Sequence, residues 1–225
     1  MSHSYMPISV ALKGTPCLVV GGGRVALRKI DALLDYDAEI TVVAPRVEEK
    51  IKFYAEKQRL KLEQREYVSP EAANYRLVIS ASDLEEVNRA VYDDTRRSGT
   101  LVNVVDNPPL CDFIFPAVVR RDCLTAAIST DGKAPFLAGH LRVVLENIFP
   151  EHWNRLAKLA GQFRTRVLKH WPDDQNKRND SFAAFLNADW KAMFADLEED
   201  EIEARLQQMI KNPPFPTIDE DDKEE

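Results

Sequence analysis

The stretch Cys17-Leu18-Val19-Val20-Gly21-Gly22-Gly23-Arg24-Val25-Ala26 decides the fold of this 225-residue chain. Four apolar residues lead directly into three glycines. After the glycines, Ala26, Ile30, Leu33 and Leu34 recur at the spacing of one helix face. A strand, a glycine turn and a helix in this order form the context in which a G-x-G-x-x-G/A pattern indicates dinucleotide binding.

Each position of this pattern has a physical role. Gly21 allows the tight turn, Gly23 lets the backbone approach a pyrophosphate, and Ala26 is small enough for the helix to pack on the strand. The start of the helix adds free N–H groups and the positive end of a dipole. The alternative is a tight turn that binds no ligand.

The pattern predicts four more strands in the first half of the chain, at 39–44, 60–65, 76–81 and 101–105. Helical patterns separate most of them, at 46–58 and after 82. Strands that alternate with helices over short connections predict an α/β fold of the Rossmann type, an open parallel sheet with helices on both faces.

Ligands of such a sheet bind beyond the carboxyl ends of its strands. The loops that begin at Gly21, Ala44, Ser80 and Asp106 should therefore converge on one crevice. Ser82 lies in the third of these loops, and Ser82-Asp83-Leu84-Glu85 has the form of a capping box, with Ser82 as the cap and Glu85 reaching back.

The pattern changes after Pro108-Pro109. Residues 113–119 and 124–128 read as two strands joined by the turn Arg120-Arg121-Asp122, and a helix follows from Pro135. A lone hairpin is barely stable, and pairing with a second copy of the chain would stabilise it. From Trp153 the pattern is helical, with a polar break at 171–180 and further helices that end near Ile210.

Asp106 is the first candidate for chemistry, because it directly follows a buried strand at the predicted crevice. A carboxylate there can accept a proton or bind a metal ion. The alternative is an Asp that only starts the turn into Pro108-Pro109. Cys111 and Asp112 lie close by, but no ligand spacing supports a metal site, and turn and core roles fit them better.

Ser129-Thr130-Asp131-Gly132-Lys133 is the second candidate. This segment connects a strand to a helix and combines hydroxyl groups, a glycine and a cation. Ser129 and Lys133 could hold carboxylates of a ligand together with backbone N–H groups. The alternative is a plain helix cap.

The acidic residue expected about 20 positions after the glycines, where it would bind an adenosine ribose, is missing. The second strand ends in Val43-Ala44-Pro45-Arg46. An arginine at this place indicates a 2′-phosphate by the general rule, so the residues alone leave NAD and NADP both open.

Composition narrows the classes of protein. The net charge of -7 argues against nucleic-acid binding, and part of it lies in the acidic end 213–225, which we expect to be disordered. No apolar run could span a membrane and no signal peptide is evident. The scattered Cys17, Cys111 and Cys123 predict reduced thiols and a cytoplasmic protein.

The motifs together resemble the precorrin-2 dehydrogenase family of sirohaem biosynthesis, which includes part of sirohaem synthase. The resemblance covers about residues 5 to 170. It is carried by five segments in order, 19–29, 41–45, 103–106 (Asn103-Val104-Val105-Asp106), 113–117 and 127–135 (Ala127 to Pro135).

The resemblance implies NAD-dependent oxidation of precorrin-2, a polycarboxylate tetrapyrrole, to sirohydrochlorin, and in some members also ferrous iron insertion. Asp106 matches the proposed catalytic carboxylate, and Arg24, Val25, Pro45 and Arg46 match cofactor contacts. We therefore expect Gly21, Gly22, Gly23 and Ser82 to complete the NAD site, Ser129 and Lys133 to bind substrate, and no resident metal ion.

The resemblance also implies a homodimer and four segments. These are a nucleotide-binding domain at 1–112, a dimerisation unit at 113–150, a helical domain at 151–212 and the acidic tail at 213–225. Three positions depart from the family pattern, which has Gly, Ser and Arg where Asp131, Ala134 and Gly139 stand. Asp131 adds a negative charge beside the expected polyanion site.

Two other functions compete with the dehydrogenase. The first is an NAD-sensing regulatory domain, although a sensor needs neither Asp106 nor the Ser129 turn. The second is a chelatase that keeps the nucleotide fold only as a scaffold.

Overall fold

The computed structural model describes residues 4–149 and 152–213. These residues form two compact units. Unit 1 holds the residues up to Pro116 together with Ser129–Pro135, and unit 2 holds Ala117–Ile128 and the chain from Phe136 onward. The predicted tail lies outside the described residues, apart from residue 213. The predicted division into four segments stays a prediction.

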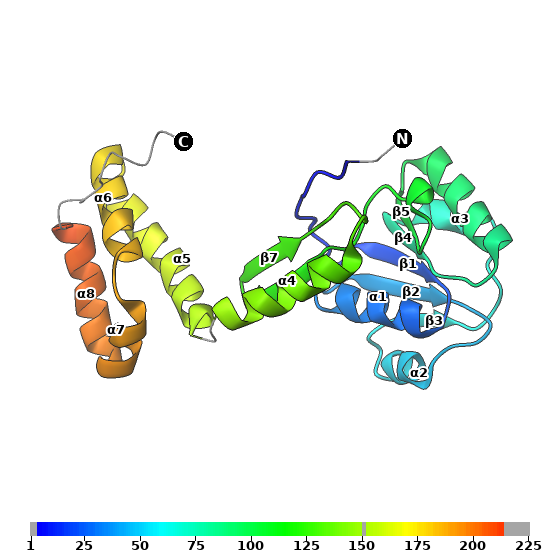
Figure 1. Cartoon of the computed structure of the whole chain (residues 1–225), viewed down its shortest axis with the longest axis horizontal. Coiled ribbons are helices and arrows are strands. Elements are labelled where there is room, and N and C mark those ends of the chain that lie inside the picture. The colour runs from blue at the N-terminus through cyan, green and yellow to red at the C-terminus, as the bar shows by residue number, and fades with distance from the viewer. Residues whose placement is uncertain (1–3, 150–151, 214–225) are drawn as a thin grey trace. The chain divides into compact units, whose positions relative to one another are not determined.

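Unit 1 is built on a parallel sheet of five strands, which confirms the predicted fold class (Figure 1). The strands lie in the order β3-β2-β1-β4-β5. Because the strand order reverses between β1 and β4, the loops that follow these two strands diverge and leave a crevice for ligands at their carboxyl ends. The strand bounds are β1 Pro16–Val20, β2 Glu39–Val43, β3 Lys61–Glu63, β4 Leu77–Ser80 and β5 Leu101–Val104.

Helices cover both faces of this sheet, because its strands are apolar on both sides. On one face, Cys17, Val19, Ile40 and other buried strand residues pack against α1 (Arg24–Leu34) and α2 (Glu49–Glu56). On the other face, Leu18, Val20 and Val78 share a core with α3 (Glu85–Ser98) and the short 3₁₀ helix η1 (Glu71–Asn74). The sequence predicted these layers correctly.

Unit 2 contains the predicted hairpin and helix. Strands β6 (Ala117–Arg121) and β7 (Leu124–Ile128) pair antiparallel, and α4 spans Pro135–Ile148. The Arg121 guanidinium donates to the carbonyl oxygens of Glu146 and Phe149, which satisfies acceptors at the carboxyl end of α4. The first strand begins four residues later than expected, since Phe113–Pro116 is not strand.

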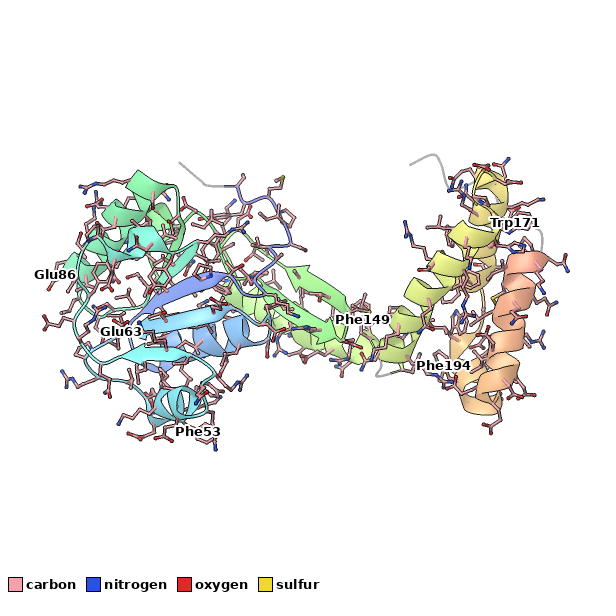
Figure 2. The ribbon with its side chains drawn as sticks, turned by 180° about the vertical axis from the view of Figure 1, so that it is seen from behind. Phe53, Glu63, Glu86, Phe149, Trp171 and Phe194 are labelled. Carbon is pink, nitrogen blue, oxygen red and sulfur yellow. The ribbon has the colours of Figure 1, made fainter. Side chains whose placement is uncertain are left out.

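The remaining chain forms the predicted helices α5 (Trp153–His170), α6 (Gln175–Leu186), α7 (Trp190–Asp196) and α8 (Glu199–Lys211). Phe163, Val167 and Leu206 lie at the centre of their core. Trp171 and Phe194 lie toward opposite ends of this helical group (Figure 2). The Trp171 indole N–H donates to the carbonyl oxygen of Ile210, which ties the end of α5 to α8.

Candidate active site at the carboxyl ends of the parallel strands

The glycine loop is locked between its neighbours by close packing. Gly21 has φ +124°, and a Cβ atom there would lie 2.3 Å from the carbonyl oxygen of Ala81. A Cβ atom on Gly22 would lie 2.1 Å from the carbonyl oxygen of Arg46. The Gly22 carbonyl also accepts a hydrogen bond of 2.9 Å from the Glu48 N–H. The loops after β1, β2 and β4 therefore meet, as the sequence predicted.

Gly23 differs from the other two glycines, because a Cβ atom there would meet nothing within 4 Å. Gly23 is the N-cap residue of α1, and no side chain caps this helix end. The first turn of α1 contains no acidic residue, and Arg24 and Val25 are exposed. The pyrophosphate of a dinucleotide fits this place, because it offers open space, uncapped N–H groups and the positive charge of Arg24.

Pro45 and Arg46 follow β2 and are exposed. Gly22 packs against the Arg46 carbonyl oxygen, so Arg46 lies beside the glycine loop, at the expected adenosine end of a dinucleotide. Here too the structure brings together residues that the sequence predicted for the cofactor.

Ser82 lies at the carboxyl end of β4, with its N–H close to Gly21, but the predicted capping box is wrong. The N-cap residue of α3 is Leu84, and the Ser82 hydroxyl accepts from the Leu84 N–H at 3.2 Å. Asn88, which sequence reasoning missed, orders this loop. Its side-chain amide donates to the Ser82 carbonyl oxygen at 2.9 Å, and its Oδ1 accepts from the Ser80 hydroxyl at 2.7 Å.

Asp106 lies in the turn directly after β5 and is exposed. Its φ of +58° is left-handed, a conformation that Asp tolerates better than most residues. Hydrogen bonds fix the turn on both sides of it, from the Val105 N–H to the Ser80 carbonyl and from the Asn107 N–H to the Val104 carbonyl. The structure thus holds the Asp106 backbone at the edge of the sheet that carries the glycine loop.

Cys111 and Asp112 have structural roles next to β5. The Cys111 thiol donates to the Val104 carbonyl oxygen at 3.1 Å, and burial raises its pKa. The Asp112 carboxylate accepts from the Val102 N–H and pairs with Arg96. In the described part of the chain, no three His, Cys, Asp or Glu side chains gather as a metal site would require.

The 129–133 turn belongs to unit 1. The Ser129 hydroxyl accepts from the Asp131 N–H, and the Thr130 hydroxyl accepts from the Ala134 N–H, each at 3.1 Å. Ser129 and Lys133 are exposed. Thr130, rather than Ser129, therefore provides the side-chain contact that precedes α4.

Asp131 stands where the family pattern has Gly, and the structure gives a reason why both fit. Its φ is +52°, which glycine and aspartate both tolerate. The departure therefore keeps the backbone conformation and adds a charge. Burial raises the pKa of Tyr5, and the charges of Cys111, Asp112 and Asp131 raise it further, so Tyr5 lies near both this turn and the segment that follows β5.

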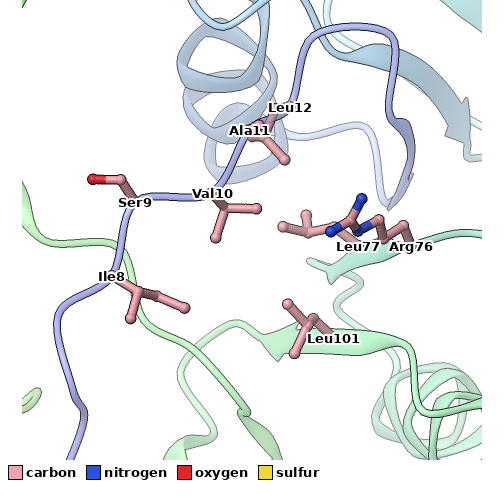
Figure 3. A pocket seen from close by; sticks show the side chains of 8 residues that line it. All are labelled: Ile8, Ser9, Val10, Ala11, Leu12, Arg76, Leu77 and Leu101. Carbon is pink, nitrogen blue, oxygen red and sulfur yellow. The ribbon is translucent and has the colours of Figure 1, made fainter.

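A cavity of about 300 Å³ lies elsewhere in unit 1 (Figure 3). Leu77 and Leu101, the first residues of β4 and β5, line it together with Arg76 and the segment Ile8–Leu12. Ile8 and Val10 point toward these leucines. The cavity is thus at the amino ends of the strands, opposite the edge where the predicted site residues lie.

Fold and loop geometry define a dinucleotide-binding protein of the Rossmann class. In agreement, residues 8–117 match the family model described as "Putative NAD(P)-binding". A solved structure, "SirC, precorrin-2 dehydrogenase", shares the fold with a TM-score of 0.73 and 24% sequence identity over 91% of this chain and 98% of that one.

The curated relatives give the family. The chain is 42% identical over 175 residues to "Siroheme synthase" of Methylococcus capsulatus, which covers 78% of this chain and 37% of that protein. It is 44% identical over 172 residues to the siroheme synthase of Pseudoalteromonas translucida, covering 75% and 36%. The chain belongs to the family of these proteins, as its motifs indicated, and spans about a third of the length of these relatives.

None of the described helices combines the length and the apolar character that crossing a bilayer requires.

Proposed function

We propose that the chain is an NAD-dependent dehydrogenase that oxidises precorrin-2 to sirohydrochlorin. The observation that carries the proposal is the placement of two features at one edge of the sheet. These are the uncapped helix start at Gly23 and the exposed carboxylate of Asp106. The names of the related siroheme synthases and of the structurally similar precorrin-2 dehydrogenase support the choice of substrate.

In this proposal the glycine loop holds the cofactor. The N–H groups at the start of α1 bind the pyrophosphate, and Gly21 and Gly22 keep the loops after β2 and β4 close enough to shape the site. Arg24, Val25, Pro45, Arg46 and Ser82 line it. When bound, NAD supplies the acceptor for the hydride. We propose NAD rather than NADP from the preference of the family.

Asp106 would act on the substrate. Oxidation removes a hydride and a proton from the tetrapyrrole, and the Asp106 carboxylate accepts the proton. Ser129 and Lys133 would bind carboxylates of the same molecule, because both are exposed on a turn near the segment that follows β5.

The proposal includes a homodimer. The α4 helix exposes Phe136, Leu137, Val143 and Ile148, with 81% of the Phe136 surface open to solvent. A second copy would bury this apolar surface. Analytical ultracentrifugation tests this point, and a monomer at micromolar concentration would contradict it.

The experiment that tests the function is anaerobic incubation of the protein with precorrin-2, with and without NAD, followed by absorbance. We expect sirohydrochlorin only with NAD. Ferrous iron is then added as a second substrate. Iron insertion faster than in the protein-free control would indicate that the chain is also a chelatase. Absence of an NAD-dependent product would favour the two competing functions, an NAD-sensing regulatory domain or a chelatase that keeps the nucleotide fold only as a scaffold.

Asp106→Asn is the matching variant. Asn also tolerates the left-handed conformation at this turn, so the charge is removed without backbone strain. We expect kcat to fall about 100-fold or more, in line with the usual contribution of a general base. Wild-type turnover in a folded variant would refute the role of Asp106.

A further inference from the structure

Lys29 is a half-buried cation at the predicted site that the function above does not use. It lies on α1, and its ammonium nitrogen is 3.9 Å from the centre of the Phe115 ring. Phe115 belongs to the segment that follows β5, and this segment is tied to the strand by the hydrogen bond from the Asn103 amide to the Phe113 carbonyl oxygen. The ring therefore holds the ammonium group in one place.

The surroundings of Lys29 leave its charge poorly compensated. Burial is the main cause that lowers its pKa, and the neighbouring Arg28 lowers it further. The charges of Asp106 and Cys111 act in the opposite direction. Lys29 thus lies near Asp106, in surroundings that favour binding of a further negative charge.

Among the described lysines whose pKa is shifted, Lys29 is the one whose pKa is lowered. Lys50, Lys61 and Lys158 each pair with a carboxylate at 3.0 Å or less. Lys29 has no carboxylate within 4.0 Å among the residues that the structure describes. A desolvated ammonium group gains most from a carboxylate that a ligand brings.

We propose that Lys29 is a specificity-determining residue, whose ammonium group, held on the Phe115 ring, binds one carboxylate of the tetrapyrrole. This inference rests on the proposed function for the identity of the ligand. The cofactor is the less suitable partner, since Lys29 lies about 7.5 Å along the helix axis from Arg24, away from the N–H groups that would hold the pyrophosphate.

The test uses direct binding, which does not depend on turnover. An octacarboxylate porphyrin, uroporphyrin, is titrated into the full chain and followed by its fluorescence anisotropy. NAD binding is measured separately by calorimetry. The variants are Lys29→Met, which removes the charge but keeps a flexible chain on the ring, and Lys29→Arg, which keeps the charge.

Lys57→Met is the matched control. Lys57 also lies over a phenylalanine ring, 5.5 Å from the centre of Phe53, but Phe53 is on α2 and Lys57 is the C-cap residue of that helix. Phe53 is exposed (Figure 2), and Lys57 follows the end of α2 opposite to Glu48, whose N–H binds the Gly22 carbonyl oxygen.

We expect Lys29→Met to weaken porphyrin binding about tenfold, which is typical for loss of one charge-assisted contact. Lys29→Arg and Lys57→Met should bind like the wild type, and all variants should bind NAD equally. Wild-type affinity should also fall as the pH rises through the lowered pKa of Lys29, because a bound carboxylate favours the charged form. The Cys111 thiol also ionises at alkaline pH, so it is a second possible cause of the loss of affinity. Lys29→Arg retains Cys111 but keeps its own charge at high pH, so its porphyrin affinity should not fall if Lys29 is the cause.

Unchanged porphyrin affinity in Lys29→Met would overturn the proposal. Equal losses of porphyrin and NAD binding would also overturn it, since they would indicate a role in the cofactor site or in the fold. If the chain fails to oxidise precorrin-2 but Lys29→Met still selectively loses the porphyrin, the binding role stands and the proposed reaction fails.

Discussion

Two adjacent glycines offer a sharp test of the cofactor site, because the structure gives them opposite surroundings. Gly22→Ala places a methyl group 2.1 Å from the Arg46 carbonyl oxygen and 2.8 Å from the Val47 Cα atom. These are backbone atoms and cannot turn away as a side chain would. Gly23→Ala places the same group in open space.

The expected cost follows from these contacts. Overpacking against rigid atoms costs about 1–3 kcal/mol. Separating the loops also weakens the 2.9 Å hydrogen bond from Glu48 to Gly22, which adds about 1 kcal/mol. Gly22→Ala should therefore lower the free energy of unfolding by roughly 2–4 kcal/mol. For Gly23→Ala we expect about 1 kcal/mol or less, the cost of a poorer N-cap.

The chain provides its own probes for the assay. All six tyrosines lie before Pro116, in unit 1, and the three tryptophans, Trp153, Trp171 and Trp190, lie in unit 2. Urea unfolding can be followed by tyrosine second-derivative absorbance and by tryptophan fluorescence in one sample. The Gly22→Ala transition should shift in the tyrosine signal, and calorimetry then measures NAD binding by each variant.

The distinguishing result concerns Gly23→Ala. We expect this variant to fold like the wild type and to lose about tenfold or more in affinity for NAD, because the methyl group takes the space that the pyrophosphate needs. Wild-type NAD affinity in Gly23→Ala would refute the hypothesis that the open space beside Gly23 holds the pyrophosphate. A Gly22→Ala protein with unchanged stability would refute the packing argument.

Three more predictions concern single residues. Burial raises the pKa of Cys17 to about 11. Unit 1 should therefore lose stability as the pH rises from 9, where the thiol of the unfolded chain ionises, toward 11. In urea unfolding, Cys17→Val should remove this part of the pH dependence. Asp131→Gly keeps the left-handed turn and removes a negative charge, so uroporphyrin should bind more tightly, and weaker binding would contradict this role. A Cβ atom at Gly139 would meet nothing within 4 Å, so Gly139→Ala should stabilise α4 by about 1 kcal/mol through its higher helix propensity. The measurement is an upward shift of the urea midpoint that tryptophan fluorescence detects.

The fold was predictable because its signals are local and repeated. The central strands β1, β2 and β4 are short, mostly apolar runs that are buried on both faces, and this pattern differs from the alternation of a surface strand. The edge strand β3, Lys61–Glu63, is short and polar instead. The order of elements then restricts the topology, since parallel strands need right-handed crossovers. The convergence of the Gly21, Ala44 and Ser80 loops follows from that topology alone.

Errors arose where a contact distant in sequence, or a polar surface, decided the local structure. The polar break predicted at 171–180 is wrong after Asp174, because α6 starts at Gln175 with the Asp174 side chain as its cap. Its first turns face solvent, and its burial begins only near Ser181. A capping box was predicted at Ser82 from spacing, but Asn88 binds the loop instead.

The site residues stay a prediction, and their contacts with segments distant in sequence were not predictable. Lys29 is the last residue of the 19–29 segment that resembles the family, yet only the fold shows that its partner is Phe115, which follows β5 in sequence. Spacing along one helix cannot indicate a cation–π contact with a distant segment. Tyr5 is a similar case, because Cys111, Asp112 and Asp131 come to it from separate parts of unit 1.

The two aspartates with left-handed backbone show how structure separates a conformational role from a chemical one. Asp106 has φ +58° and Asp131 has φ +52°, so glycine or asparagine would satisfy either backbone. At 131 the family pattern has Gly, and conformation alone accounts for what that position requires. At 106 the matching residue is Asp, although the backbone does not demand a carboxylate. The charge at 106 therefore needs another explanation, and the proton transfer that we propose for the exposed Asp106 carboxylate would provide one.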